Sequence, residues 1–571
     1  IKASLQGQLQ HIVGSSPVQI QRRRYINKLL ADLYNPPITL LALSNPSPEL
    51  VDITPKVPER PQILFFATLI GLSLVIQADL QVNTRHRFEG TGNKSSTSRF
   101  LISIGYILFA LGCTWILSIS LVAGIGCMLA IQVTTWLFRH TRLALPLYIA
   151  LAGPGLGLST NTDGILSRIF IGNLLFCILI FIWFSKKLLA GRALLSTKNR
   201  SKPNKNRLLL APLIGITSSG LLSIIASRLF PDPQVTYAFI HSNIPLTLVN
   251  ISEASILLGL PLIIGLVPGF TRTRHDIQLI LATYLGIGLI YAFGTIFAPL
   301  LGLVSQETLL GIQRPIIFGA ISSGLGNLLA LFTCVAFGLC LYAPSRIPRI
   351  GYFCLFCLLT TGVLFSLGRE AWLALLLAIC AMSGLHNRRC LLLVIPVLLL
   401  IFILLMSGSI DFFNPQKVYG SDRLAIWQDA LAIWQRRPYF GVGAGNYQFF
   451  DLSYGSDIVG VAHNQYLEVL AEMGLQGLVC LIWFLIVLGY LLVYRFLRAA
   501  TALGKAIALA GIGCYLTILF GGFFSDMLLP SAAAGGGMGP FITTSYRWLL
   551  LGLALSIPAW EKHQSEPSPP A

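Results

Sequence analysis

Two arginines and one histidine stand out in this strongly apolar sequence because their side chains suit the handling of a phosphate group and of a proton. Arg369 lies in Ser366-Leu-Gly-Arg-Glu-Ala-Trp372, Arg423 lies in Ser-Asp-Arg-Leu-Ala-Ile-Trp427, and His463 lies in Ala-His-Asn-Gln-Tyr-Leu-Glu468. A guanidinium binds phosphate oxygens through two parallel hydrogen bonds, and an imidazole can accept a hydroxyl proton near neutral pH. If the fold brings the three together, they could bind a phosphorylated substrate and activate a hydroxyl group.

Each of these residues also has a purely structural explanation. Arg369 could pair with Glu370 or extend toward the lipid boundary, because an isolated guanidinium at membrane depth costs several kcal/mol. Arg423 could be a solvated anchor at the membrane interface. A single histidine such as His463 is more often an ordinary polar residue than a catalyst. Spacing alone leaves both explanations open for each residue.

The elements that must position these residues are membrane helices. The chain has 571 residues, of which 55% are hydrophobic and 11% are charged, and its mean hydropathy is +0.74. Residues 101–138 contain no charged side chain, and this stretch alone exceeds the roughly 20 residues that span a bilayer. Backbone polar groups in lipid must be satisfied within the chain, and the alternation typical of a membrane β-barrel is missing from the sequence. We therefore predict an all-α, polytopic integral membrane helical bundle.

The apolar segments predict about 14–15 transmembrane helices. The weakest candidate is 143–159, because Gly153-Pro154-Gly155 interrupts it. The candidates are residues 62–78, 100–118, 119–138, 143–159, 168–184, 208–227, 254–270, 276–299, 316–342, 351–368, 371–385, 391–407, 475–494, 505–525 and 541–558.

The distribution of basic residues predicts the orientation of the chain. The net charge is +18, and one alternating set of loops holds 24 Lys and Arg residues whereas the opposite set holds nine. Positive charge in membrane proteins concentrates on the cytoplasmic side, so the first set and the C-terminus are predicted to be cytoplasmic. This also explains the basic charge better than a nucleic-acid partner does. The basic, proline-rich arm at 1–61 conflicts with this orientation if all 15 segments span, so the N-terminal topology stays open.

The longest interior polar interval, residues 408–474, is predicted to face outward and to carry amphipathic helices. Within it, leucine and tryptophan recur at helical spacing from Leu424 to Trp434, which predicts a helix at the membrane interface that ends at Pro438. Gly441, Gly443 and Gly445 then predict a tight turn. A second amphipathic helix is expected from His463 or Asn464 through Glu472, ending at Gly474.

Several other function classes lack support in the sequence. The predicted outward loops contain no Asp-x-Asp pair that would hold a divalent metal, so we expect no metal. The chain contains no Walker A motif, which argues against an ATP-driven pump. All 11 cysteines fall in or beside apolar segments, and neither a zinc site nor a disulfide is expected. We also expect no cofactor.

The loop motifs resemble those of the O-antigen ligase / Wzy polymerase superfamily. The resemblance rests on Asp422-Arg-Leu-Ala-Ile-Trp427, on Arg437-Pro-Tyr-Phe-Gly-Val-Gly-Ala-Gly-Asn446 and on Ala462-His-Asn-Gln-Tyr-Leu-Glu-Val-Leu-Ala-Glu-Met-Gly474. It extends to the hairpin at 366–373 and more loosely to residues 313–327, and it covers roughly residues 310–500. The N-terminal 250 residues resemble the family only in being helical membrane spans.

The resemblance implies a bacterial inner-membrane glycosyltransferase of the GT-C type that acts at the periplasmic face without a metal. Such enzymes transfer a glycan from an undecaprenyl-diphosphate carrier to an acceptor, which here could be a glycan, a lipid or a protein. By this resemblance, Arg423, Arg369 and Arg314 match arginines that bind the diphosphate of the donor, and His463 matches the histidine that activates the acceptor hydroxyl. The sequence has Glu370 where a small residue usually follows the arginine.

Two questions remain open at this stage. The motifs do not separate a ligase from a polymerase or from a protein-glycosylating enzyme. Some cyanobacterial members of the superfamily carry a label as inorganic-carbon accumulation proteins, so a membrane transporter is the alternative. A transporter should show ionisable residues or broken helices at the membrane midplane, and internal repeats. The predicted spans contain very few ionisable residues, and the sequence shows no internal repeat.

The predicted organisation follows from these segments. It comprises a polar arm at 1–61, an N-terminal transmembrane region at 62–300, the transmembrane region of the ligase-like module at 301–407, the large loop at 408–474, C-terminal helices at 475–560 and a cytoplasmic tail at 561–571.

Overall fold

The computed structural model describes only part of the chain. The described residues are 132–153, 171–194, 205–237, 245–271, 273–299, 301–302, 306–309, 312–317, 322–389, 392, 396, 420–455, 460–531 and 539–565. The predicted arm at 1–61, the candidate spans 62–78 and 100–118, and nearly all of 391–407 lie outside these residues.

The described residues fall into two compact units. The first comprises those within 145–176 and 201–571, and the second comprises those within 35–144 and 177–200. In the second unit, the Lys186 ammonium group lies 5.5 Å from the centroid of the Phe138 ring, and that of Lys187 lies 4.1 Å from the Trp183 ring. All four predicted site residues belong to the first unit, which is described below.

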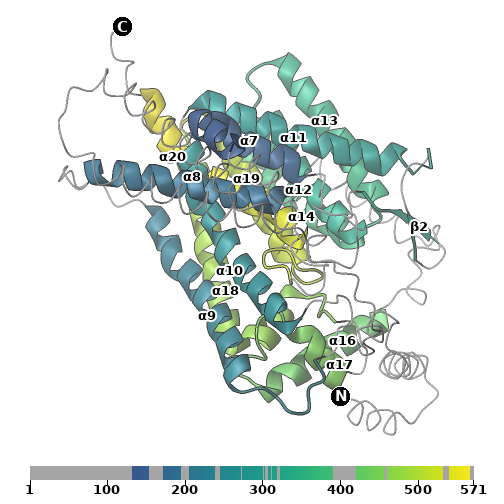
Figure 1. Ribbon diagram of the computed structural model, residues 1–571. Helices are drawn as coiled ribbons and strands as arrows, with labels where there is room; N and C mark the ends of the chain where they lie inside the picture. Colours follow the sequence, from purple (N-terminus) through teal and green to yellow (C-terminus); the bar gives the residue numbers. More distant parts are fainter. Residues whose placement is uncertain are drawn as a thin grey trace, which may run out of the picture. The chain divides into compact units, whose positions relative to one another are not determined.

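The structure is built almost entirely from helices (Figure 1). The helices are α7 (Thr141–Ala152), α8 (Ile171–Leu194), α9 (Leu210–Leu229), α10 (Leu246–Phe270), α11 (Arg274–Phe297), α12 (Ser322–Leu341), α13 (Arg346–Phe365), α14 (Arg369–His386), α16 (Gly420–Arg436), α17 (Tyr447–Tyr454), α18 (Gln465–Arg498), α19 (Ala502–Gly521) and α20 (Gly539–Ser565), with a short 3₁₀ helix, η2, at Lys205–Leu209.

Eight helices within the described residues are long and apolar enough to cross a membrane. This confirms the prediction of an all-α polytopic membrane bundle. The sequence did not predict one small addition, an antiparallel hairpin of β1 (Gln306–Leu309) and β2 (Ile312–Pro315) between α11 and α12. Of the candidate span 143–159, residues 154–159 lie outside the described residues, and the described part belongs to α7, a helix of 12 residues, and to Gly153 directly after it.

Local sequence signals set where these helices begin. Thr273 and Asp276 form a capping box at the start of α11, in which each side chain accepts a hydrogen bond from the other residue's backbone N–H. Thr501 caps α19 through a bond from the backbone of Gly504. At the start of α18, Asn464 accepts hydrogen bonds from two backbone N–H groups.

The pairing of α12, α14, α18 and α19 defines two ends of the bundle. At one end, the ring of Tyr342, directly after α12, lies 4.9 Å from the His386 ring of α14 and 6.4 Å from the Phe496 ring of α18, centroid to centroid. A Cβ added to Gly338 would lie 2.7 Å from the carbonyl oxygen of Ala506, near the start of α19. The first residues of α12 and α14 and the last residues of α19 therefore lie at the opposite end, which we call the loop end.

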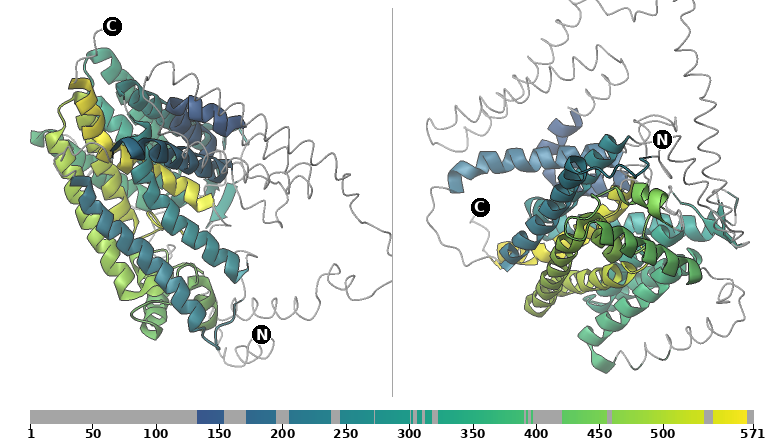
Figure 2. Two further views of the ribbon diagram at one scale, coloured as in Figure 1. Left: turned by 60° about the vertical axis from the view of Figure 1, so that its left-hand side comes forward. Right: turned by 90° about the horizontal axis from the view of Figure 1, so that it is seen from below.

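The polar loop packs onto the loop end through α16, α17 and the first part of α18. Gly474, with φ 70° and ψ −169°, divides α18 into a short helix up to Met473 and the long apolar helix that follows. The sequence predicted α16, the second amphipathic helix and its end at Gly474, but it did not predict α17. The left view of Figure 2 shows the green helices of the loop gathered beside one end of the longer helices.

Candidate functional site

The backbone holds His463 at a bend immediately before α18. Its φ is 47°, which is uncommon for a residue with a side chain, and its side chain is exposed. The next residue, Asn464, accepts hydrogen bonds from the backbone N–H groups of Tyr466 at 3.0 Å and Leu467 at 3.2 Å. Strained backbone of this kind often occurs where a fold holds a functional group in place.

Arg423 lies in the first turns of α16 and packs against a different part of the chain. Its guanidinium carbon lies 5.4 Å from the centroid of the Phe524 ring, and both side chains are half-buried. A guanidinium over an aromatic face gains a cation–π attraction while its edge stays free to donate hydrogen bonds. The contact therefore orients the guanidinium of Arg423.

The segment Gly522–Leu529, which follows α19, connects the surroundings of His463 with those of Arg423. Gln465 binds this segment four times. Its backbone N–H donates to the carbonyl of Gly522 at 2.8 Å, its Oε1 accepts from the backbone of Met527 at 3.0 Å and of Leu528 at 2.7 Å, and its Nε2 donates to the carbonyl of Leu529 at 3.2 Å. The residue two positions after His463 thus holds the segment that carries Phe524 beneath Arg423.

Arg369 begins α14 directly after a tight hairpin. Leu367 has a φ of 58°, the Ser366 hydroxyl donates to the carbonyl of Val363 at 2.7 Å, and the Trp372 indole donates to the same carbonyl at 2.8 Å. Arg369 is half-buried. The Oε1 oxygen of Glu370 is buried and accepts no hydrogen bond from any described residue, so Arg369 does not donate to that oxygen.

Arg314 lies in β2, in register with Glu307 of β1. The hairpin follows α11, and the last turns of α11 lie at the loop end. A Cβ added to Gly362, near the end of α13, would lie 3.2 Å from Ala292 of α11 and 3.3 Å from the side chain of Leu329, in the first half of α12. Arg314 therefore lies at the loop end, as the other three predicted site residues do, but on the β1–β2 hairpin.

All four predicted site residues therefore lie at the loop end of the first unit. Arg423 and the turn of His463 share the segment Gly522–Leu529. Arg369 lies at the start of α14, and Arg314 lies in the hairpin that precedes α12. Their roles in binding or catalysis stay predictions.

The glycine turn after α16 fixes the loop through close backbone contacts. Gly441, Gly443 and Gly445 have φ values of 70°, 106° and 80°, a region that favours glycine. A Cβ on Gly441 would lie 2.3 Å from the backbone of Glu472, and one on Gly474 would lie 2.1 Å from the carbonyl oxygen of Tyr439. The turn joins α16 to the short helix that follows His463.

The same turn is anchored on α9 and α10, which lie outside the resemblance noted in the sequence. The Asn446 amide donates to the Ser227 hydroxyl at 3.1 Å and accepts from Asn250 at 2.9 Å, and Arg228 donates to Asn250 at 2.8 Å. The Ser223 hydroxyl accepts from the backbone of Ala444 at 3.0 Å. The N-terminal half thus supports the loop.

Three carboxyl groups behind His463 were not recognised from the sequence. Glu468 accepts a hydrogen bond at 3.3 Å from the backbone of Ala462, the residue before His463, and its carboxyl group pairs with that of Asp526. Burial, then the charges of Asp526 and Glu472, raise the pKa of Glu468 well above its ordinary value. Burial also raises the pKa of Asp526 to about 6, although the hydrogen bond with Glu468 opposes the rise.

Glu472, one turn further along the short helix, is the third carboxyl group. It accepts hydrogen bonds from the backbone of Tyr447 at 3.0 Å and of Gly445. Burial raises its pKa to about 7, partly offset by these two bonds. No simple signal marks these acids in the sequence, because acidic residues in a polar loop are ordinarily solvated.

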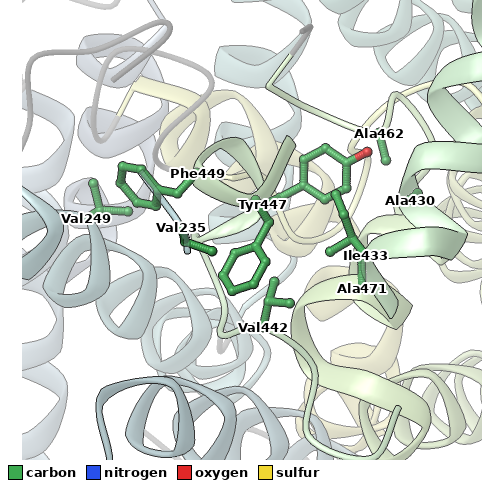
Figure 3. Packing of buried hydrophobic residues seen from close by; sticks show 10 residues of the cluster. Val235, Val249, Ala430, Ile433, Val442, Tyr447, Phe449, Ala462 and Ala471 are labelled. Atoms are coloured by element: carbon green, nitrogen blue, oxygen red, sulfur yellow. The ribbon is translucent and has the colours of Figure 1, made fainter. Parts of the chain in front are cut away.

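Buried apolar residues of the loop pack together with Val235 and Val249 in one cluster (Figure 3). Val249 of α10, Ile433 of α16, Phe449 of α17 and Ala471 of α18 all belong to it. Tyr447 is 1% exposed, and its hydroxyl points toward the side of the cluster where Ala430 and Ala462 lie. Burial, followed by the charges of nearby carboxylates, raises the pKa of Tyr447 well above its ordinary value. The cluster thus explains why the neighbouring carboxyl groups are poorly solvated.

Comparison with known families matches residues 353–482 to a family model described as O-antigen ligase. The matched segment runs from α13 into the apolar part of α18 and includes Arg369, Arg423 and His463, but not Arg314. A comparison with curated proteins found no match.

Proposed function

We propose that this chain, which belongs to the O-antigen ligase / Wzy family through residues 353–482, transfers a glycan from a polyprenyl-diphosphate carrier to an acceptor hydroxyl group. The observation that carries the proposal is the link between Arg423 and His463. Gln465 holds the segment on which Arg423 packs, and it lies two residues from His463.

Arg423 has the chemistry to bind the diphosphate of the donor, with Arg369 and Arg314 at the same end of the bundle as further ligands. A diphosphate becomes a good leaving group once its negative charge is neutralised, and preorganised guanidinium groups can supply that neutralisation. Because arginine stays protonated at all physiological pH values, this does not depend on proton transfer.

His463 would accept the proton of the acceptor. The acceptor oxygen attacks the anomeric carbon of the first sugar, the bond from that carbon to the diphosphate oxygen breaks with its electron pair, and the hydroxyl proton passes to the imidazole. The exposure of His463 leaves its side chain reachable by an acceptor. The acceptor could be a glycan, a lipid or a protein.

The charge pattern of the loops supports placing this reaction at the outer face of a bacterial inner membrane, with the C-terminus cytoplasmic. An undecaprenyl-diphosphate carrier and a GT-C mechanism without a metal belong to the same proposal.

A deletion strain complemented with the wild-type gene or with His463→Ala tests the proposed function. The wild type should restore the length and attachment of surface glycans, and His463→Ala should not, although it reaches the membrane in equal amount. Normal glycans with His463→Ala would overturn the catalytic assignment. Loss of bicarbonate uptake with unchanged glycans would instead support the transporter alternative.

A further inference from the structure

Two consecutive phenylalanines in the segment Gly522–Leu529 lie on different partners. Phe524 lies against Arg423, whereas Phe523 lies against Tyr466, with ring centroids 4.8 Å apart and planes at 48°. Tyr466 is three residues after His463. The two phenylalanines thus contact Arg423, which is proposed to bind the diphosphate, and the helix turn that follows His463, the proposed proton acceptor.

The ring of Tyr466 is held in place on several sides. Its hydroxyl donates to the carbonyl of Leu519 at 2.8 Å. Gly522 lets the ring approach the backbone, since a Cβ there would lie 3.3 Å from two atoms of Tyr466. The backbone N–H of Tyr466 donates to Asn464. Because the Tyr466 ring is already fixed by these contacts, it can support the ring of Phe523 without losing further side-chain freedom.

Phe523 remains 50% exposed although Tyr466 supports one side of it. Its partner, the half-buried Tyr466, is polar at one edge. Gln465 donates two hydrogen bonds to the segment Gly522–Leu529 and accepts two from it, which fixes the backbone on either side of Phe523. This combination of a rigid support and an open aromatic face suits the binding of a flat, weakly polar ring.

We propose that Phe523, supported by Tyr466, stacks on the pyranose ring that is joined to the donor diphosphate. This inference rests on the proposed function. A diphosphate at Arg423 and an acceptor hydroxyl at His463 require the anomeric carbon between them. Phe523 adjoins Phe524, which packs against Arg423, and itself packs against Tyr466, three residues after His463. The carbon–hydrogen face of a pyranose carries partial positive charge, which complements the negative face of a phenylalanine ring.

Stacking would position the sugar and would also select among donors. A pyranose with an unhindered carbon–hydrogen face would bind well, whereas an axial substituent on that face would prevent close contact. Phe523 is then a positioning residue for the donor sugar, and it takes no part in proton transfer.

The test compares the binding of two probes, farnesyl diphosphate and farnesyl diphosphate linked to N-acetylglucosamine, to the purified full-length protein in detergent. The variants are Phe523→Leu, which keeps an apolar side chain, and Phe523→Tyr, which keeps the aromatic face. Phe353→Leu is the matched control, because Phe353 of α13 is 54% exposed.

The wild type, Phe523→Tyr and Phe353→Leu should bind the sugar-linked probe more tightly than the free diphosphate. Phe523→Leu should lose roughly three- to tenfold of that preference, as expected for one aromatic stacking contact, with unchanged affinity for farnesyl diphosphate. A full preference in Phe523→Leu, or an equal loss for both probes, overturns the stacking role alone. Binding of neither probe by the wild type overturns the proposed function as well.

Discussion

The side-chain oxygen of Gln465 accepts a hydrogen bond at 2.7 Å from the backbone N–H of Leu528, although 63 positions separate the two residues. The bond is buried, and the side-chain amide of Gln465 also donates to Leu529. A buried amide whose oxygen and nitrogen are both bonded fixes one arrangement of two segments, because any shift would leave polar atoms unpaired. The positions of His463 and Phe524 depend on this bond.

Gln465→Leu should therefore impair glycan transfer, although Gln465 is not proposed to contact the substrate. The variant leaves the backbone N–H groups of Met527 and Leu528 without their acceptor, which costs about 1–3 kcal/mol for each buried donor. We expect a lower melting temperature in detergent together with reduced transfer. Gln476→Leu is the control, because Gln476 is a half-buried glutamine just beyond Gly474 whose Nε2 donates to no described residue. Equal melting temperatures of Gln465→Leu and the wild type would contradict this role.

Arg423→Lys should weaken donor binding even though it keeps the positive charge. A lysine ammonium group cannot form the bidentate hydrogen bonds of a guanidinium, so we expect donor affinity to fall by about tenfold, and by more in Arg423→Ala. Titration of purified protein with farnesyl diphosphate measures the change. Arg388→Lys is the control because Arg388 is exposed and lies two residues after the end of α14, away from the loop end. Unchanged affinity in Arg423→Ala would remove Arg423 from the donor site.

Gly474→Ala and Gly351→Ala should have opposite effects on stability. Gly474 has a φ of 70°, and an added Cβ would lie 2.1 Å from the carbonyl oxygen of Tyr439, so the substitution should cost about 2 kcal/mol or more. Gly351 lies within α13, and a Cβ added there would meet nothing within 4 Å. Replacing it with alanine should stabilise that helix by about 0.5–1 kcal/mol. Thermal unfolding in detergent measures both, and a Gly474→Ala variant as stable as the wild type would contradict the packing of this turn.

Glu472 should make the stability of the loop depend on pH. Its pKa is about 7 in the folded protein against an ordinary value of 4.5, so the folded state binds more protons than the unfolded state between these values. The free energy of unfolding should therefore fall as the pH rises from 4.5 to 7, by at most about 1.4 kcal/mol per pH unit from this group. Glu472→Gln should reduce this slope while it preserves an acceptor for the backbone of Tyr447. An unchanged slope in thermal unfolding at pH 5, 6, 7 and 8 would contradict the assignment.

The sequence predicted much of the fold because membrane helices leave a direct signal in hydropathy. The candidate 276–299 corresponds to α11 at Arg274–Phe297, and 371–385 corresponds to α14 at Arg369–His386. The loop helix α16 was also predicted, because its leucines and tryptophans recur at helical spacing. The short helix α17 was missed, since its eight residues, Tyr447–Tyr454, are too few to show a clear helical period in the sequence.

The candidate site could be predicted only in part. Arginine and histidine are conspicuous in an apolar sequence, and the structure places Arg314, Arg369, Arg423 and His463 at one end of the bundle. Asp526 and Phe523 gave no such signal, because they follow directly on an apolar span and their importance depends on contacts with Glu468 and Tyr466. Such contacts between segments about 60 residues apart leave no local pattern in the sequence.

The central claim is that Arg423 binds the diphosphate of a lipid-linked donor beside His463. An experimental structure of the full-length protein with a non-transferable polyprenyl-diphosphate-linked sugar tests it most directly. We expect phosphate oxygens within hydrogen-bonding distance of the Arg423 guanidinium, with the anomeric carbon facing the imidazole of His463. A diphosphate bound away from Arg423, with His463 remote from the sugar, would contradict it.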